Sequence, residues 1–254
     1  MKYLLLALAL AGLAQPVRAE TLGSFTSERP QPWEAGALRN VSLAAALVNG
    51  TVLAPGASFS FNKAMEARLG DFVEGTSFLG GREVKSLGGG ICQVSTGLYN
   101  AALLSGLEVL ERNGHSLYDP REAYAPPGRD AMVSREGGSD FRFRNSTASP
   151  LTIQASAEGG RLSVTLLGRQ RHPRSRWIET VLLDRETKNV LTVPDPDLEP
   201  GSCAQAGQGF DGLKVSTRVC WKGPGGRTEH AALGVDHYVR VDERWRVGSQ
   251  PSQP

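Results

Sequence analysis

The stretch that decides the fold is GGGICQVSTGLYNAALLSG, residues 88–106. Three glycines precede a run of small and apolar residues at helical spacing, and Gly106 supplies a stop signal. The pattern predicts a glycine loop that opens a helix, with Cys92 in the first turn. The helical face expected to pack on a core consists of Ile91, Val94, Ser95, Leu98 and Ala102.

The sequence before this stretch predicts a helix and a strand. Residues 39–50 have helical spacing, with Asn40 as a plausible cap and Gly50 as the stop. Phe59 and Phe61 then alternate with serines, which indicates a strand with one buried face.

The sequence after it is β-rich. Segments 151–157 and 162–167 flank Gly159 and Gly160, which is the pattern of a β-hairpin. With 30 Gly and 15 Pro, the chain favours many turns over a helical bundle. We therefore expect an α+β fold, in which a mixed domain with the glycine loop and the Cys-helix spans 20–172 and a small β-rich domain spans 173–254.

The first nineteen residues are typical of a signal peptide. Lys2 precedes an apolar core at 3–13, and small residues end at Ala19, where we expect cleavage. Later apolar runs are far shorter than the roughly 20 residues of a membrane helix. The chain is expected to be exported to the periplasm, the cell wall or the medium, with no transmembrane anchor after cleavage.

Charge argues against a nucleic-acid partner. The net charge is +2, and cleavage would remove Lys2 and Arg18, which leaves basic and acidic residues equal in number. A nucleic-acid binder needs a basic surface.

The three cysteines divide into an expected pair and a free thiol. In an exported protein, Cys203 and Cys220 are spaced for a disulfide across a glycine-rich loop, which would contribute about 3 kcal/mol. Cys92 is then left over as a free thiol.

Metal and cofactor sites are not expected. The four histidines are scattered and form no paired ligand motif, and no phosphate-binding glycine loop is present. The histidines are His115, His172, His230 and His237.

Several motifs taken in order resemble the VanW-like family over roughly residues 38–168. They are PGASFSFN at 55–62, GGGICQVST at 88–96, LYNAA at 98–102, ER at 111–112, HS at 115–116, PGRDA at 127–131 and DFRFRN at 140–145. The family usually has threonine where this chain has Gly97. The resemblance implies a role at the bacterial envelope near peptidoglycan, without a defined activity. Residues 173–254 are faintly similar to G5 domains, which are associated with cell-wall carbohydrate or adhesion.

The candidate chemistry centres on Cys92. A thiol at a helix N-terminus is favoured as thiolate by the helix dipole and by free backbone N–H groups. His115 would be the base, and Asp130 or Asp140 would orient it, in an order similar to papain-like and transglutaminase-like folds. The residues expected to bind a ligand or an oxyanion are Gly88, Gly89, Gly90, Gln93 and Ser95.

A structural interpretation competes with the catalytic one. Free cysteines are often buried, and the glycines of 88–90 could exist only for a tight entry into the helix. Two hypotheses therefore stand. One is a Cys-dependent amide or ester hydrolase or acyl transferase acting on peptidoglycan or its peptide precursors, and the other is a non-catalytic module that binds the cell wall or acts as an adhesive at the surface.

Overall fold

The computed structural model describes residues 19–28, 34–79, 82–121, 123–169 and 175–248. Nearly all of the expected signal peptide, 1–19, and the expected domain boundary at 172 lie outside the described residues. Those two expectations stay predictions. None of the helices in the described ranges is both long and apolar enough to cross a bilayer.

A four-stranded antiparallel sheet forms the centre of the N-terminal part. Its order is β1-β9-β8-β2. The β8–β9 hairpin predicted from the sequence is confirmed, and its alternate side chains are buried because a strand turns every second residue to the same face. The bounds are β1 Glu20–Glu28, β2 Val52–Leu53, β8 Leu151–Glu158 and β9 Arg161–Gly168.

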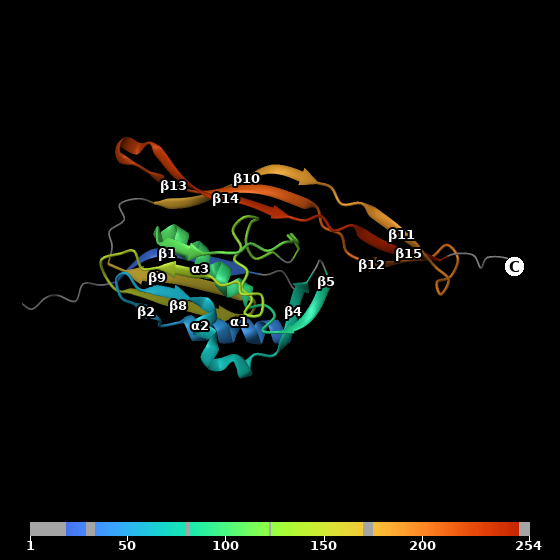
Figure 1. The fold of residues 1–254 in the computed structure, drawn as a ribbon, viewed down its shortest axis with the longest axis horizontal. Coiled ribbons are helices and arrows are strands. Elements are labelled where there is room, and N and C mark those ends of the chain that lie inside the picture. Colours follow the sequence, from blue (N-terminus) through green and yellow to red (C-terminus); the bar gives the residue numbers. More distant parts are fainter. Residues whose placement is uncertain (1–18, 29–33, 80–81, 122, 170–174, 249–254) are drawn as a thin grey trace, which may run out of the picture.

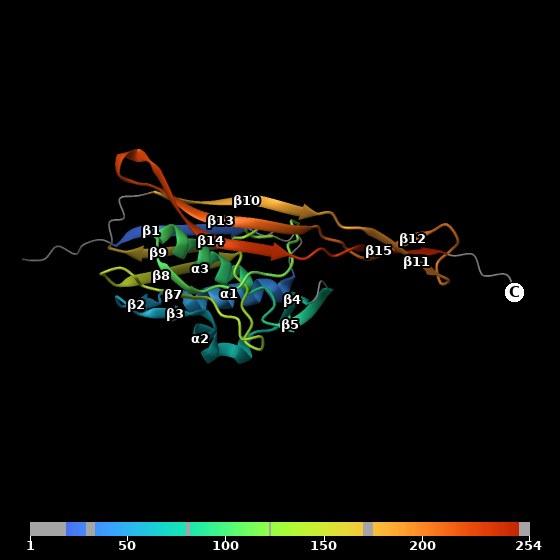
Figure 2. The same cartoon turned by 45° about the horizontal axis from the view of Figure 1, so that its top comes forward.

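Two helices cover one face of this sheet, the face that carries the buried side chains of β8 and β9, while the opposite face carries mostly polar, partly exposed side chains. Helix α1 (Ala35–Val48) packs on β8, and helix α3 (Cys92–Ser105) packs on β1 and β9 (Figures 1 and 2). Helix α1 begins before Asn40, so the prediction of Asn40 as its cap is wrong. The Asn40 amide is buried and instead donates to the carbonyls of Val73 (2.8 Å) and Gly89 (3.0 Å).

Helix α3 is enclosed on every side. It begins at Cys92 and ends before Gly106, whose φ of 71° is left-handed, as the sequence predicted. The sequence predicted one buried face, yet residues 93–103 are all buried. A Cβ on Gly97 would lie 2.8 Å from the Leu162 side chain, so this glycine lets α3 approach β9 closely.

Smaller elements lie beside α1 and α3. Phe59 and Phe61 are buried as expected, but the strand ends at Ser60 because its hydroxyl accepts from Lys63 N (3.2 Å) and caps a short helix. These elements are β3 Ser58–Ser60, α2 Phe61–Met65, the 3-10 helix η1 Glu66–Asp71, the β4–β5 hairpin (Glu74–Leu79 and Arg82–Leu87), β6 Glu108–Glu111 and β7 Arg142–Arg144.

The C-terminal part is almost entirely β and forms two three-stranded sheets. The inner sheet, of order β10-β13-β14, lies over α3, and the outer sheet, of order β11-β15-β12, extends away from the body (Figures 1 and 2). The α+β class is confirmed. The bounds are β10 Arg176–Glu186, β11 Val190–Asp195, β12 Cys203–Gly207, β13 Gly212–Lys222, the 3-10 helix η2 Pro224–Gly226, β14 Thr228–Tyr238 and β15 Glu243–Gly248.

The disulfide predicted between Cys203 and Cys220 is wrong. Both thiols are free, and they lie in different sheets. Cys203 pairs with Val247 in the outer sheet, whereas Cys220 is near the far end of β13. Because a strand rises about 3.3 Å per residue, Cys220 is about 26 Å along β13 from its first residue.

Candidate functional site

Cys92 opens helix α3 directly after the glycine loop. Its side chain is half-buried and packs against the hydrophobic core, and its Sγ donates to the carbonyl oxygen of Val133 (3.6 Å). Gly88 and Gly90 have φ values of 78° and 103°, which favour glycine. The thiol therefore lies at the positive end of the helix dipole, as the sequence predicted.

The glycine loop is tightly packed. A Cβ on Gly89 would lie 2.2 Å from the Gly75 carbonyl oxygen, so two backbones meet here at contact distance. The N–H groups of Gly88 and Gly89 already donate to Val73 and Ser86. In the described part of the chain, the N–H groups of Gly90 and Cys92 donate to no such backbone carbonyl.

His115 lies between the thiol and a carboxylate. Its Nδ1 lies 2.6 Å from Asp130 Oδ2, and its backbone N–H donates to the same oxygen at 2.6 Å. The other side of the imidazole interacts with the Cys92 sulfur. The His115 side chain is 30% exposed.

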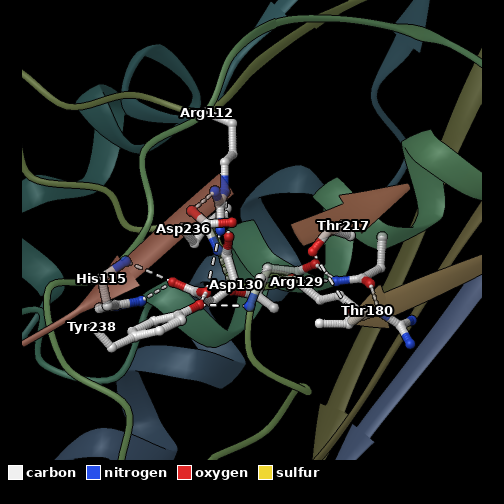
Figure 3. A network of polar contacts seen from close by, with 12 residues as sticks. Arg112, His115, Arg129, Asp130, Thr180, Thr217, Asp236 and Tyr238 are labelled. Atoms are coloured by element: carbon white, nitrogen blue, oxygen red, sulfur yellow. Dashed lines mark hydrogen bonds and ion pairs between the residues drawn. The ribbon is translucent and has the colours of Figure 1, made fainter. Parts of the chain in front are cut away.

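Asp130 is held through its second oxygen as well. Tyr238 Oη donates to Oδ1 (2.6 Å), and Arg112 Nη2 lies 3.2 Å from the same atom (Figure 3). Burial raises the pKa of Asp130, but hydrogen bonds from His115 and Tyr238 and the charges of His115 and Arg112 lower it well below its usual range. The carboxylate stays ionised.

The thiol and the imidazole shift each other's pKa in the directions that favour a thiolate beside an imidazolium. Burial raises the pKa of Cys92, but the hydrogen bond and the positive charge of His115 hold it below the ordinary value. Burial lowers the pKa of His115, yet Asp130 and the Cys92 sulfur raise it to about 10. A thiolate beside an imidazolium is the reactive form of a cysteine nucleophile.

Asp130 and not Asp140 meets His115. Asp140 lies at the start of α2, where its carboxylate accepts from Asn62 N (2.9 Å), Phe141 N (2.8 Å) and the Ser60 hydroxyl (2.5 Å). These contacts tie the Asp140 carboxylate to the residues around Ser60 and Asn62, so Asp140 takes no part in the Cys92–His115–Asp130 cluster.

Gln93 and Ser95, which the sequence assigned to a ligand site, are buried inside the protein. Gln93 Nε2 donates to Ser27 Oγ (3.1 Å), and Ser95 Oγ donates to the Ala131 carbonyl (2.6 Å). Their exposed fractions are 1% and 0%. They pack α3 against its neighbours and cannot touch a ligand in this conformation.

Three residues that the sequence did not assign to the site belong to it. Arg112 contacts Asp130, and Asp236 and Tyr238 approach from β14 (Figure 3). Arg112 belongs to a family motif, which was a usable signal. No spacing rule could connect Asp236 and Tyr238 to a carboxylate more than 100 residues away.

Among the described residues, no three or more His, Cys, Asp or Glu side chains are grouped to hold a metal ion. The cluster at Cys92 is instead a linear series of thiol, imidazole and carboxylate.

Two G5 structures align with about a third of this chain. An IgA1 protease G5 domain covers 31% of this chain and 92% of its own, at 14% identity and a TM-score of 0.24. HP0197-G5 covers 30% of this chain and 97% of its own, at 16% identity and a TM-score of 0.19. TM-scores this low do not establish a common fold.

Two relatives match over half of the chain or less. Uncharacterized protein YoaR of Bacillus subtilis (strain 168) is 40% identical over 129 residues, which are 50% of this chain and 41% of YoaR. Vancomycin B-type resistance protein VanW of Enterococcus faecalis (strain ATCC 700802 / V583) is 33% identical over 112 residues, 42% of this chain and 40% of VanW. The chain thus matches less than half the length of each relative.

The family comparison covers the region that contains Cys92, His115 and Asp130. The profile described as VanW like protein matches residues 37–167, which is more than half of the chain. The motifs quoted from the sequence all fall within or at the edge of this match. The chain therefore belongs to the VanW-like family.

Proposed function

We propose that this protein is an exported envelope enzyme that uses Cys92 to cleave or transfer an acyl group of peptidoglycan peptides. The observation that carries the proposal is the direct contact series from the Cys92 sulfur through His115 to Asp130. The expected signal peptide and the vancomycin-resistance name of one relative favour the envelope and its peptides as the place of action.

The reaction requires no cofactor. The thiolate attacks the carbonyl carbon of an amide or ester, and a C–S bond forms while negative charge develops on the oxygen. The Gly90 and Cys92 N–H groups are the proposed oxyanion donors. The C–N or C–O bond then breaks, and the leaving group takes the proton from His115. Water or a second amine resolves the thioester, and His115 accepts its proton.

Asp130 serves this cycle without exchanging a proton. Its carboxylate accepts from His115 Nδ1, which directs the opposite ring nitrogen towards the sulfur and stabilises the imidazolium. The half-buried setting of the thiol strengthens these charge interactions relative to water.

The test is the pH dependence of iodoacetamide alkylation at Cys92 in the folded chain, followed by peptide mass mapping. We expect a midpoint below the usual cysteine value of about 8.5. His115→Gln should move the midpoint up towards that value, whereas His230→Gln, at an exposed position of β14, should not. A wild-type thiol that reacts only after denaturation would contradict the proposal.

The substrate class needs its own measurement. Soluble muropeptides from purified sacculi are incubated with the protein, and the intact mass is followed for an acyl adduct on Cys92. Cys92→Ala should abolish both the adduct and any change in the muropeptides. If the Cys92 thiol is acidic but no adduct and no change in the muropeptides is found, Cys92 remains a reactive cysteine and peptidoglycan peptides are excluded as its substrate.

A further inference from the structure

Two residues of the C-terminal sheet reach into the site and contact its polar groups. Tyr238 and Asp236 lie two residues apart on β14, so their side chains share the inward face, while His237 between them is exposed. Tyr238 is only 3% exposed, and the Asp236 side chain is 16% exposed. Such buried polar groups are costly unless they are paired, and both are paired with the site.

Tyr238 holds the loop that carries Asp130. Its hydroxyl donates to Asp130 Oδ1 (2.6 Å) and accepts from the backbone N–H of Gly128 (2.6 Å). One phenol thus fixes both the carboxylate and the backbone two residues before it. Its ring packs against Tyr118 at 5.6 Å between centroids, which fixes the phenol in turn.

Asp236 holds the arginine that supports the same carboxylate. It pairs with Arg112 Nη1, while Arg112 Nη2 contacts Asp130 Oδ1 (3.2 Å) and Nε donates to the Asp130 carbonyl (2.6 Å). The exposed fractions of the Arg112 and Asp236 side chains, 14% and 16%, place this ion pair away from most solvent screening.

The neighbouring strand, β13, packs against the same loop, the one that carries Gly128 and Asp130. A Cβ on Gly128 would lie 2.2 Å from Thr217 Oγ1 and 3.1 Å from Val215 of β13, so the loop touches the inner sheet directly. Figure 3 shows Thr217, Asp236 and Tyr238 around Asp130 and Arg129. The loop of Asp130 is thus one contact between the two parts of the chain, besides the packing of β10 on α3.

We infer that the inner C-terminal sheet completes the site, with Tyr238 and Asp236 as positioning residues that hold Asp130 and Arg112 so that His115 stays aligned with Cys92. The inference rests on the proposed function and adds to it, because β14 lies beyond the region that matches the family, residues 37–167. The matched region alone would lack both residues.

The alignment of His115 has a measurable consequence at the sulfur. An imidazole held at Nδ1 by a fixed carboxylate keeps its charge beside the thiolate, and a loosened carboxylate does not. The loss of a donor to Asp130 also strengthens the interaction of the carboxylate charge with His115. This effect by itself would keep the imidazole charged and lower the alkylation midpoint of Cys92. The charged or titratable groups around Asp130 are Cys92, Tyr99, Arg112, His115, Tyr118, Arg129, Asp236 and Tyr238.

The test uses Tyr238→Phe in the full chain, because phenylalanine keeps the ring and removes only the hydroxyl. We expect the iodoacetamide rate constant at Cys92 to fall about tenfold at pH 7, within the range of one lost hydrogen bond to a charged group, and the alkylation midpoint to rise. His237→Ala, on the outward face of the same strand, should leave both unchanged. Circular dichroism checks that each variant is folded.

Asp236→Asn provides a second variant that keeps side-chain size. It frees Arg112 and should move the midpoint in the same direction. A folded Tyr238→Phe with a wild-type profile, or with a lower midpoint and an undiminished rate, would overturn the inference and leave the proposed function standing. If Tyr238→Phe does not fold, an unchanged profile in Asp236→Asn overturns it. A wild-type thiol without an acidic midpoint overturns the proposed function itself.

Discussion

Asp130→Asn removes the one charge that Arg112, His115 and Tyr238 share. Each carboxylate oxygen of Asp130 accepts a hydrogen bond, Oδ1 from Tyr238 Oη and Oδ2 from the His115 N–H. In asparagine one of these oxygens becomes an amide nitrogen, which is itself a donor and would face a donor in either orientation. Breaking a buried ion pair costs about 3 to 5 kcal/mol. Arg112 keeps Asp236 as a partner, so we expect the free energy of unfolding to fall by about 3 kcal/mol at pH 7.

This loss should depend on pH in a defined direction. The pKa of Asp130 is lowered in the folded state, so its contribution to stability is present above the unfolded value, near 3.9, and declines as pH falls below it. At pH 3 the wild type should have lost about 1.3 kcal/mol of this contribution. The variant has no carboxylate to protonate, so the difference between the two proteins should narrow by that amount.

The assay is urea denaturation followed by tryptophan fluorescence at pH 7 and pH 3. Asp71→Asn is the matched control, since its pair with Arg68 is exposed and should contribute less than about 0.5 kcal/mol. A difference of under 1 kcal/mol at pH 7, or a difference that is equal at both pH values, would refute the reasoning.

Gly89→Ala should lower the free energy of unfolding by about 2 to 3 kcal/mol, the cost of overpacking a core, because its Cβ would meet the Gly75 backbone, which cannot rotate away. In the same urea titration, Gly70→Ala should change the free energy of unfolding little, because nothing lies within 4 Å of the added Cβ. Alkylation of the denatured protein without reductant should modify all three cysteines. In the folded protein, Cys203 should react while the buried Cys220 should not. A mass that shows only one modified thiol in the denatured protein would restore the disulfide between Cys203 and Cys220.

The cysteines show where sequence reasoning reached a correct residue by an incorrect route. Cys92 was singled out as the odd thiol of three, on the assumption that Cys203 and Cys220 are bonded. They are not, and Cys92 is one of three free thiols. Its distinction is the environment: a helix N-terminus, an imidazole and a carboxylate, which the local motif only partly encodes.

The amino-acid sequence by itself determined the local features of this protein: the glycine loop, the helix that begins at Cys92 and ends before Gly106, the β8–β9 hairpin and the family. These follow from periodicity and from backbone preferences that act within a few residues. Only the tertiary structure decided that Asp130 rather than Asp140 meets His115, that Gln93 and Ser95 are buried, and that the Tyr238 hydroxyl donates to Asp130. Those contacts join segments up to 108 residues apart, and their geometry depends on how the sheets pack on α3, which no local pattern specifies.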